Sequence, residues 1–95
     1  MKNCQVLILK TNQILVSQLE PTDAELPGEP DVRLIDPCVL HTEGEEKGTL
    51  TKWLEGITIQ NEMMIHSDQI LTIVEPVTVL TQDYNEVLQE RRPSW

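Results

Sequence analysis

The amino-acid sequence predicts an all-β protein, a small, strongly bent five-stranded open barrel followed by a C-terminal α-helix. Three observations predict this architecture. Five short apolar runs fall within residues 1–76, as is typical of small barrels. Polar or proline-containing segments separate these runs. From residue 77 onward the apolar residues instead recur at the spacing of one helix face.

The predicted strands are residues 4–10, 14–20, 32–41, 62–66 and 69–75. The first two form a hairpin, because Asn12 in the break between them tolerates a positive φ. Pro21 ends the second strand, since proline donates no backbone hydrogen bond, and Pro37 predicts a bulge or an edge position in the third. Residues 50–59 fit either a bent strand or a turn of helix.

The C-terminal segment, residues 77–95, is predicted to be a helix and tail packed on a barrel formed by residues 1–76. Its apolar residues recur at i, i+4, i+7 and i+8, as Leu80, Tyr84, Val87 and Leu88. Such a stripe favours packing against the core of the same chain, and a partner-binding helix is the alternative.

Composition limits the function. The chain has 95 residues and a formal net charge of -9, so its surface repels phosphate backbones unless a local basic patch overrides it. No apolar run is long enough for a membrane span or a signal peptide, so we expect a cytoplasmic protein without a membrane partner. Cys4 and Cys38 are interpreted as buried thiols. We expect no metal and no cofactor, since no ligand spacing is present.

Two segments carry a family resemblance. Residues 65–73 read Ile-His-Ser-Asp-Gln-Ile-Leu-Thr-Ile. This stretch resembles the second signature motif of the Sm-like RNA-binding family, with His66 at its basic position and Ser67 at its glycine. Residues 10–19 resemble the first motif, with Asn12 and Ser17 at its two glycine positions. The resemblance runs along most of the chain and is close to the small Sm-like proteins of marine phages that infect cyanobacteria, which would place the protein in a bacterial host cell.

The resemblance implies a homo-oligomeric ring in which neighbouring subunits pair their edge strands. The interface residues that it implies are Ile65, Ile70, Leu71 and Ile73. It also implies a uridine-binding site, whose positions correspond to Glu25, Pro27, His66 and Ser67. Glu25 offers neither a flat face nor a positive charge, and Pro27 has no side-chain hydrogen-bonding group, so this site is predicted to be lost or nearly so.

Three functions therefore stay open. The first is a non-enzymatic Sm-like ring. The second is a protein that binds single-stranded RNA through other basic residues, for which the candidates are Arg33, Lys52, Arg91 and Arg92. The third is an acidic adaptor that binds a basic host protein. Catalysis is not expected, because consecutive residues such as His66, Ser67 and Asp68 cannot form a nucleophile–base–orienter line.

Overall fold

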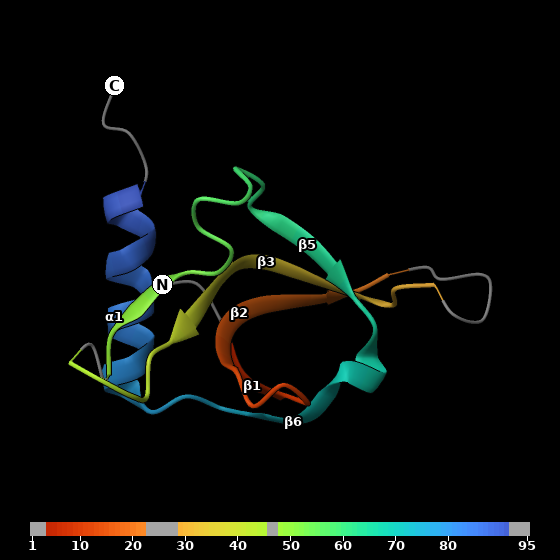
Figure 1. Ribbon diagram of the computed structural model, residues 1–95, viewed down its shortest axis with the longest axis horizontal. Coiled ribbons are helices and arrows are strands. Elements are labelled where there is room, and N and C mark those ends of the chain that lie inside the picture. The colour runs from red at the N-terminus through yellow and green to blue at the C-terminus, as the bar shows by residue number, and fades with distance from the viewer. Residues whose placement is uncertain (1–3, 23–28, 46–47, 92–95) are drawn as a thin grey trace.

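The protein folds as an antiparallel sheet of six strands with one C-terminal helix (Figure 1). The computed structural model describes residues 4–22, 29–45 and 48–91. Its elements are β1 (Gln5–Leu9), β2 (Ile14–Pro21), β3 (Val32–Leu40), β4 (Leu50–Lys52), β5 (Glu62–Ile65), the 3-10 turn η1 (Ser67–Gln69), β6 (Ile70–Val74) and α1 (Thr78–Arg91). The strand order is β4-β3-β2-β1-β6, and β5 also pairs with β3.

The prediction of five strands is wrong by one, because residues 50–65 contribute two strands to the same edge of β3. β4 pairs with the end of β3, where Cys38 lies opposite Lys52. β5 pairs with the start of β3, where Val32 lies opposite Ile65. Between β4 and β5 the backbone turns through Leu54, whose φ is 62°. The segment that was ambiguous in sequence is thus a three-residue strand followed by a turn.

The hairpin of β1 and β2 is confirmed. The Asn12 amide donates to the Leu9 carbonyl at 2.9 Å, and the Leu9 amide donates to the Gln13 carbonyl at 3.0 Å. Asn12 has a φ of 70°, a conformation that asparagine adopts more readily than most residues because its short side chain can hydrogen-bond locally.

The bulge predicted at Pro37 is also confirmed. Val16 pairs with Cys38 and Gln18 pairs with Ile35, so Ser17 alone faces two residues of β3. A bulge of this kind bends the strand and increases its twist. Ser17 is fully buried at the bend, and its hydroxyl lies 2.9 Å from the Gln18 carbonyl and 3.1 Å from the Ile35 carbonyl.

Alternating side chains supply each face of the sheet with its own apolar cluster. We call the first the helix-side cluster, which is made of Cys4, Val6, Val16, Cys38, Leu50, Tyr84 and Leu88. We call the second the inner cluster, which is made of Leu7, Leu9, Leu15 and Leu34. Figure 1 shows the strands curving around one side, whereas α1 lies against the other. The predicted packing of the helical stripe on the sheet is confirmed, since Leu80 and Val87 also pack on the helix-side cluster.

Tyr84 fastens α1 to the bulge. Its hydroxyl donates toward the Asp36 carbonyl at 2.9 Å, with the Ile35 carbonyl at 3.2 Å, and it accepts from Gln18 Nε2 at 3.3 Å. Burial raises the pKa of the Tyr84 phenol well above its usual range, so the hydroxyl stays protonated and available as a donor. Both cysteines are free and buried, as predicted. No helix in the described part of the chain is long and apolar enough to cross a membrane.

Candidate functional site

A carboxylate clasp joins the turn between β5 and β6 to the start of β3. Asp31 accepts two hydrogen bonds from Ser67, one from the backbone amide to Oδ1 and one from the hydroxyl to Oδ2, each 2.7 Å long. We call this pair the Asp31–Ser67 clasp. It links residues 36 positions apart in the chain. The clasp thus ties the turn η1, which lies in the predicted second motif, to the residue that precedes β3.

Strand register explains why Asp31 reaches Ser67. Val32 lies opposite Ile65 at the end of the β3–β5 ladder, so one step further places Asp31 beside His66 and within reach of Ser67. The hydrogen bonds from Ser67, first from its side chain and then from its backbone, hold the pKa of the Asp31 carboxyl below its usual value. Sequence reasoning missed Asp31. The signal that could have found it is the pairing of the two apolar runs, which puts this acid opposite the turn.

The clasp changes what the turn can offer a ligand. The two donors of Ser67, its amide and its hydroxyl, both point at one carboxylate. His66 precedes them, half-buried and in extended conformation at φ -81° and ψ 135°. A ligand here meets a negative charge, and the two donors of Ser67 are already engaged by it. Glu25 and Pro27, the other residues implied for a uridine site, lie outside the described residues.

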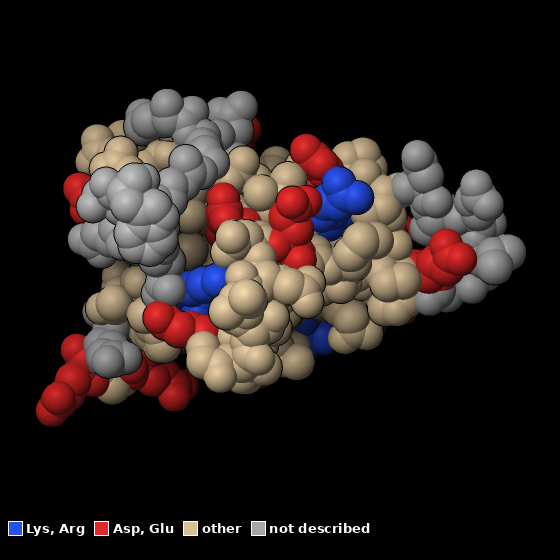
Figure 2. Space-filling model, turned by 90° about the horizontal axis from the view of Figure 1, so that it is seen from above, with Lys and Arg blue, Asp and Glu red and all other residues tan. Residues whose placement is uncertain are grey.

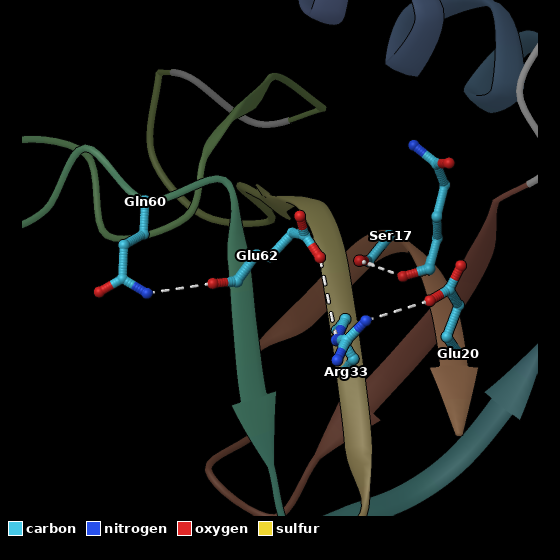
Figure 3. Close-up of polar contacts among 6 residues, drawn as sticks. Ser17, Glu20, Arg33, Gln60 and Glu62 are labelled. Carbon is cyan, nitrogen blue, oxygen red and sulfur yellow. Dashed lines mark hydrogen bonds and ion pairs between the residues drawn. The ribbon is translucent and has the colours of Figure 1, made fainter. Parts of the chain in front are cut away.

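Arg33 is engaged by acids. Its guanidinium lies 3.5 Å from Glu20 Oε2 and 3.8 Å from Glu62 Oε1 (Figure 3). The three residues come from β2, β3 and β5, which are neighbours in the sheet, so one arginine bridges two flanking strands. Each side chain is more than a third exposed, so water screens the attraction and the stability gained is small. The positive charge of Arg33 is nevertheless matched by two carboxylates.

The other basic candidates do not gather around Arg33. Lys52 lies on β4 opposite Cys38, and Cys38 is five positions along β3 from Arg33, about 16 Å in an extended strand. Arg91 is the last residue of α1, and Arg92 lies outside the described residues. Figure 2 shows the Lys and Arg side chains of one face apart from one another, with acidic side chains among them. The structure therefore brings Arg33 and Lys52 to different parts of the sheet.

The predicted interface residues divide into two kinds. Ile65 and Ile70 pack on the inner cluster and are half-buried. Leu71 and Ile73 are exposed on β6, together with Val74, which sequence reasoning did not single out. Among the described residues, β6 pairs with β1 alone and β5 with β3 alone, so each strand has an edge without a partner strand.

Both apolar faces of the sheet extend to the free edge of β6. Ile73 lies opposite Leu7 of the inner cluster, and Val74 lies opposite Val6 of the helix-side cluster. Directly opposed residues of an antiparallel pair share a face, so each exposed side chain continues one buried layer. Ile73 is 46% exposed and Val74 is 47% exposed. A further strand on this edge would cover both.

Within the described ranges, no group of three or more His, Cys, Asp or Glu is arranged to hold a metal ion. Comparison with known families gives one result. Residues 2–89 match the profile of DUF6561, described as a family of unknown function. A search of curated proteins finds no match to the chain.

Proposed function

Because the chain belongs to the DUF6561 family, whose function is unknown, its role must be inferred from the molecule, and we propose that it is a non-enzymatic Sm-like protein that assembles into a homo-oligomeric ring. The observation that carries this proposal is the free edge of β6, where Leu71, Ile73 and Val74 expose apolar side chains on a strand that pairs on one side only. Exposed edges of this kind recruit another strand.

The partner strand that we propose is β5 of a neighbouring copy. It has an unpaired edge among the described residues, and it carries Met63 on the inner face opposite Leu34. Joining β5 of one copy to β6 of the next is a head-to-tail contact, which leaves no free edge only when the copies close into a ring.

Three local features support an Sm-like open barrel as the subunit. Asn12 and Ser17, at the two glycine positions of the first motif, occupy a turn with positive φ and the bend of β2. The second motif forms a strand, a single 3-10 turn and a strand. The strong bend at Ser17 allows β2 and β3 to wrap the inner cluster.

We further propose that this ring does not use the uridine pocket of the Sm-like family. The Ser67 donors are taken by Asp31, and the Arg33 charge is matched by Glu20 and Glu62. Fluorescence anisotropy with labelled oligo-U and oligo-A at low salt tests this, since electrostatic attraction is least screened there. We expect no saturable binding. Saturable binding that weakens with salt would instead support the RNA-binding alternative.

The second candidate function is an acidic adaptor for a basic host protein. The net charge of -9 favours it, because an assembled ring multiplies that charge and attracts a basic surface over a distance of about 10 Å at 0.1 M salt. Pull-down from host lysate at low salt, with elution by moderate salt, would identify such a partner.

The ring itself is tested by native mass spectrometry and light scattering of the wild type and of Leu71→Lys, Ile73→Lys and Thr42→Lys. Thr42 is exposed in the loop after β3, so Thr42→Lys is the matched control. Each lysine reduces the negative charge of the copy, which by itself favours association. Loss of assembly in the two β6 variants alone would therefore report the strand edge. Wild-type protein that stays monomeric at every salt concentration would refute the proposal.

A further inference from the structure

The most exposed large apolar side chains of the described residues lie in two short segments. Ile57 and Ile59 precede β5 and are 77% and 92% exposed, whereas Val77 and Val79 follow β6 and are 71% and 65% exposed. We call the first pair the β5 flank and the second pair the β6 flank. In Figure 1 the green segment before β5 lies above β3, whereas the blue start of α1 lies at the lower left, so the two flanks of one copy are apart.

Pairing between copies has a register fixed by the faces of the sheet. Met63 lies opposite Leu34 on the inner face, and Ile73 lies opposite Leu7 on the same face. Opposed residues share a face, so Met63 must meet an inner-face residue of the neighbouring β6. If Met63 pairs with Ile73, all four residues of β5 lie opposite residues of β6. The resulting pairs are Glu62 with Val74, Met63 with Ile73, Met64 with Thr72, and Ile65 with Leu71.

This register also aligns the flanks. In an antiparallel pair, the residues that precede one strand run beside those that follow the other. Continuing the same register outward sets Ile59 against Val77, whereas Val79 already lies in the first turn of α1. Ile59, the most exposed of these side chains, therefore meets Val77 of the neighbouring copy.

From this alignment we propose that the β5 flank of each copy docks on the β6 flank of the next copy, so that Ile59 covers Val77 and extends the interface beyond the paired strands. The occupant of the exposed flank is a second copy of this chain. The inference rests on the proposed ring and adds a contact that strand pairing alone does not require.

Disulfide trapping tests the contact. Directly opposed residues of antiparallel strands have Cα atoms about 4.5–5.5 Å apart, which is within reach of a disulfide. The double variant Ile59→Cys/Val77→Cys should form a ladder of covalent oligomers on a non-reducing gel after mild oxidation. The native Cys4 and Cys38 are buried, so they contribute little background. Neither single variant should give the ladder, because a head-to-tail contact never brings two copies of one position together.

A second pair separates failure of this contact from failure of the ring. Met64 and Thr72 are exposed and face each other in the same register, so Met64→Cys/Thr72→Cys reports strand pairing alone. A ladder from the strand pair without a ladder from the flank pair would overturn the flank contact and leave the ring standing. No ladder from either pair, with a monomeric mass, would overturn both. Dimers from a single variant would show a two-fold contact and would also overturn the proposal.

Affinity gives a further readout. Ile59→Ser removes an apolar side chain that docking would bury, so the protein concentration at half-assembly should rise at least about tenfold. Gln60→Ser, in the same segment, should change it by less than about threefold. Equal effects of the two substitutions would contradict the contact.

Discussion

Replacing Tyr84 by phenylalanine tests how α1 is held to the bent sheet. The Tyr84 hydroxyl is fully buried and lies 2.9 Å from the Asp36 carbonyl and 3.2 Å from the Ile35 carbonyl. A hydroxyl has one proton, so the closer Asp36 carbonyl is the principal acceptor. The Ile35 carbonyl also lies 3.1 Å from the Ser17 hydroxyl, whose nearer acceptor is the Gln18 carbonyl at 2.9 Å.

Tyr84→Phe should therefore remove this donor from the part-buried Asp36 carbonyl, to which the weaker Cys38 Sγ donor lies at 3.9 Å. Such a loss costs about 1–3 kcal/mol of the free energy of unfolding, and each kcal/mol lowers the midpoint of a domain of this size by about 4–8 °C. The measurement is urea unfolding and thermal unfolding by circular dichroism. Mutant and wild type are compared at one protein concentration, because the proposed assembly would make stability concentration-dependent.

Gln18→Leu is the matched control, since Gln18 contacts the same hydroxyl only as a donor, at 3.3 Å. It should cost less than Tyr84→Phe, because the hydroxyl keeps its acceptor. A change of less than about 0.5 kcal/mol for Tyr84→Phe would refute the reasoning and would mean that the bulge carbonyls are satisfied in another way.

Three further predictions concern charge and reactivity. The pKa of Asp31 is lower in the folded protein than its ordinary value. The clasp therefore contributes its full stability above the ordinary carboxyl pKa and loses it as the pH falls through the folded pKa. NMR titration of Asp31 should show the lowered pKa, and Ser67→Ala should reduce the shift. Copies with a net charge of -9 repel one another, so assembly measured by light scattering should strengthen from low to high salt; weaker assembly at high salt would contradict this. Burial raises the pKa of the Cys4 thiol, and Cys38 is buried too, so both should react with a thiol reagent at least about tenfold more slowly in the native protein than in urea.

Much of the fold could be predicted because its signals are local. Asn12 marks a turn by its own conformational preference, Pro37 marks a bulge by its missing donor, and the stripe containing Tyr84 marks a helix by its period. The extra strand β4 could not be predicted, because it has only three residues and the turn after it depends on Leu54, a residue type that gives no warning of a positive φ.

The candidate site was less predictable because it depends on register between distant segments. Ser67 was recognised by its place in a motif, whereas its partner Asp31 lies next to a loop and has no motif of its own. The neutralisation of Arg33 likewise arises only when β2 and β5 flank β3. The apolar side chains of β6 are exposed because β6 is the last strand of the sheet. The order of strands in a sheet cannot be read from the sequence directly.

The neck between β2 and β3 has a practical consequence. The Thr22 amide donates to the Asp31 carbonyl at 3.2 Å, and the Thr22 hydroxyl donates to the Pro30 carbonyl at 3.0 Å. These bonds hold both ends of the connection together, independently of the length of chain between them. Closing a longer connection costs only about 0.6 kcal/mol for each doubling of its length. The position between Thr22 and Pro30 is therefore a natural insertion point for an affinity tag or a reporter peptide.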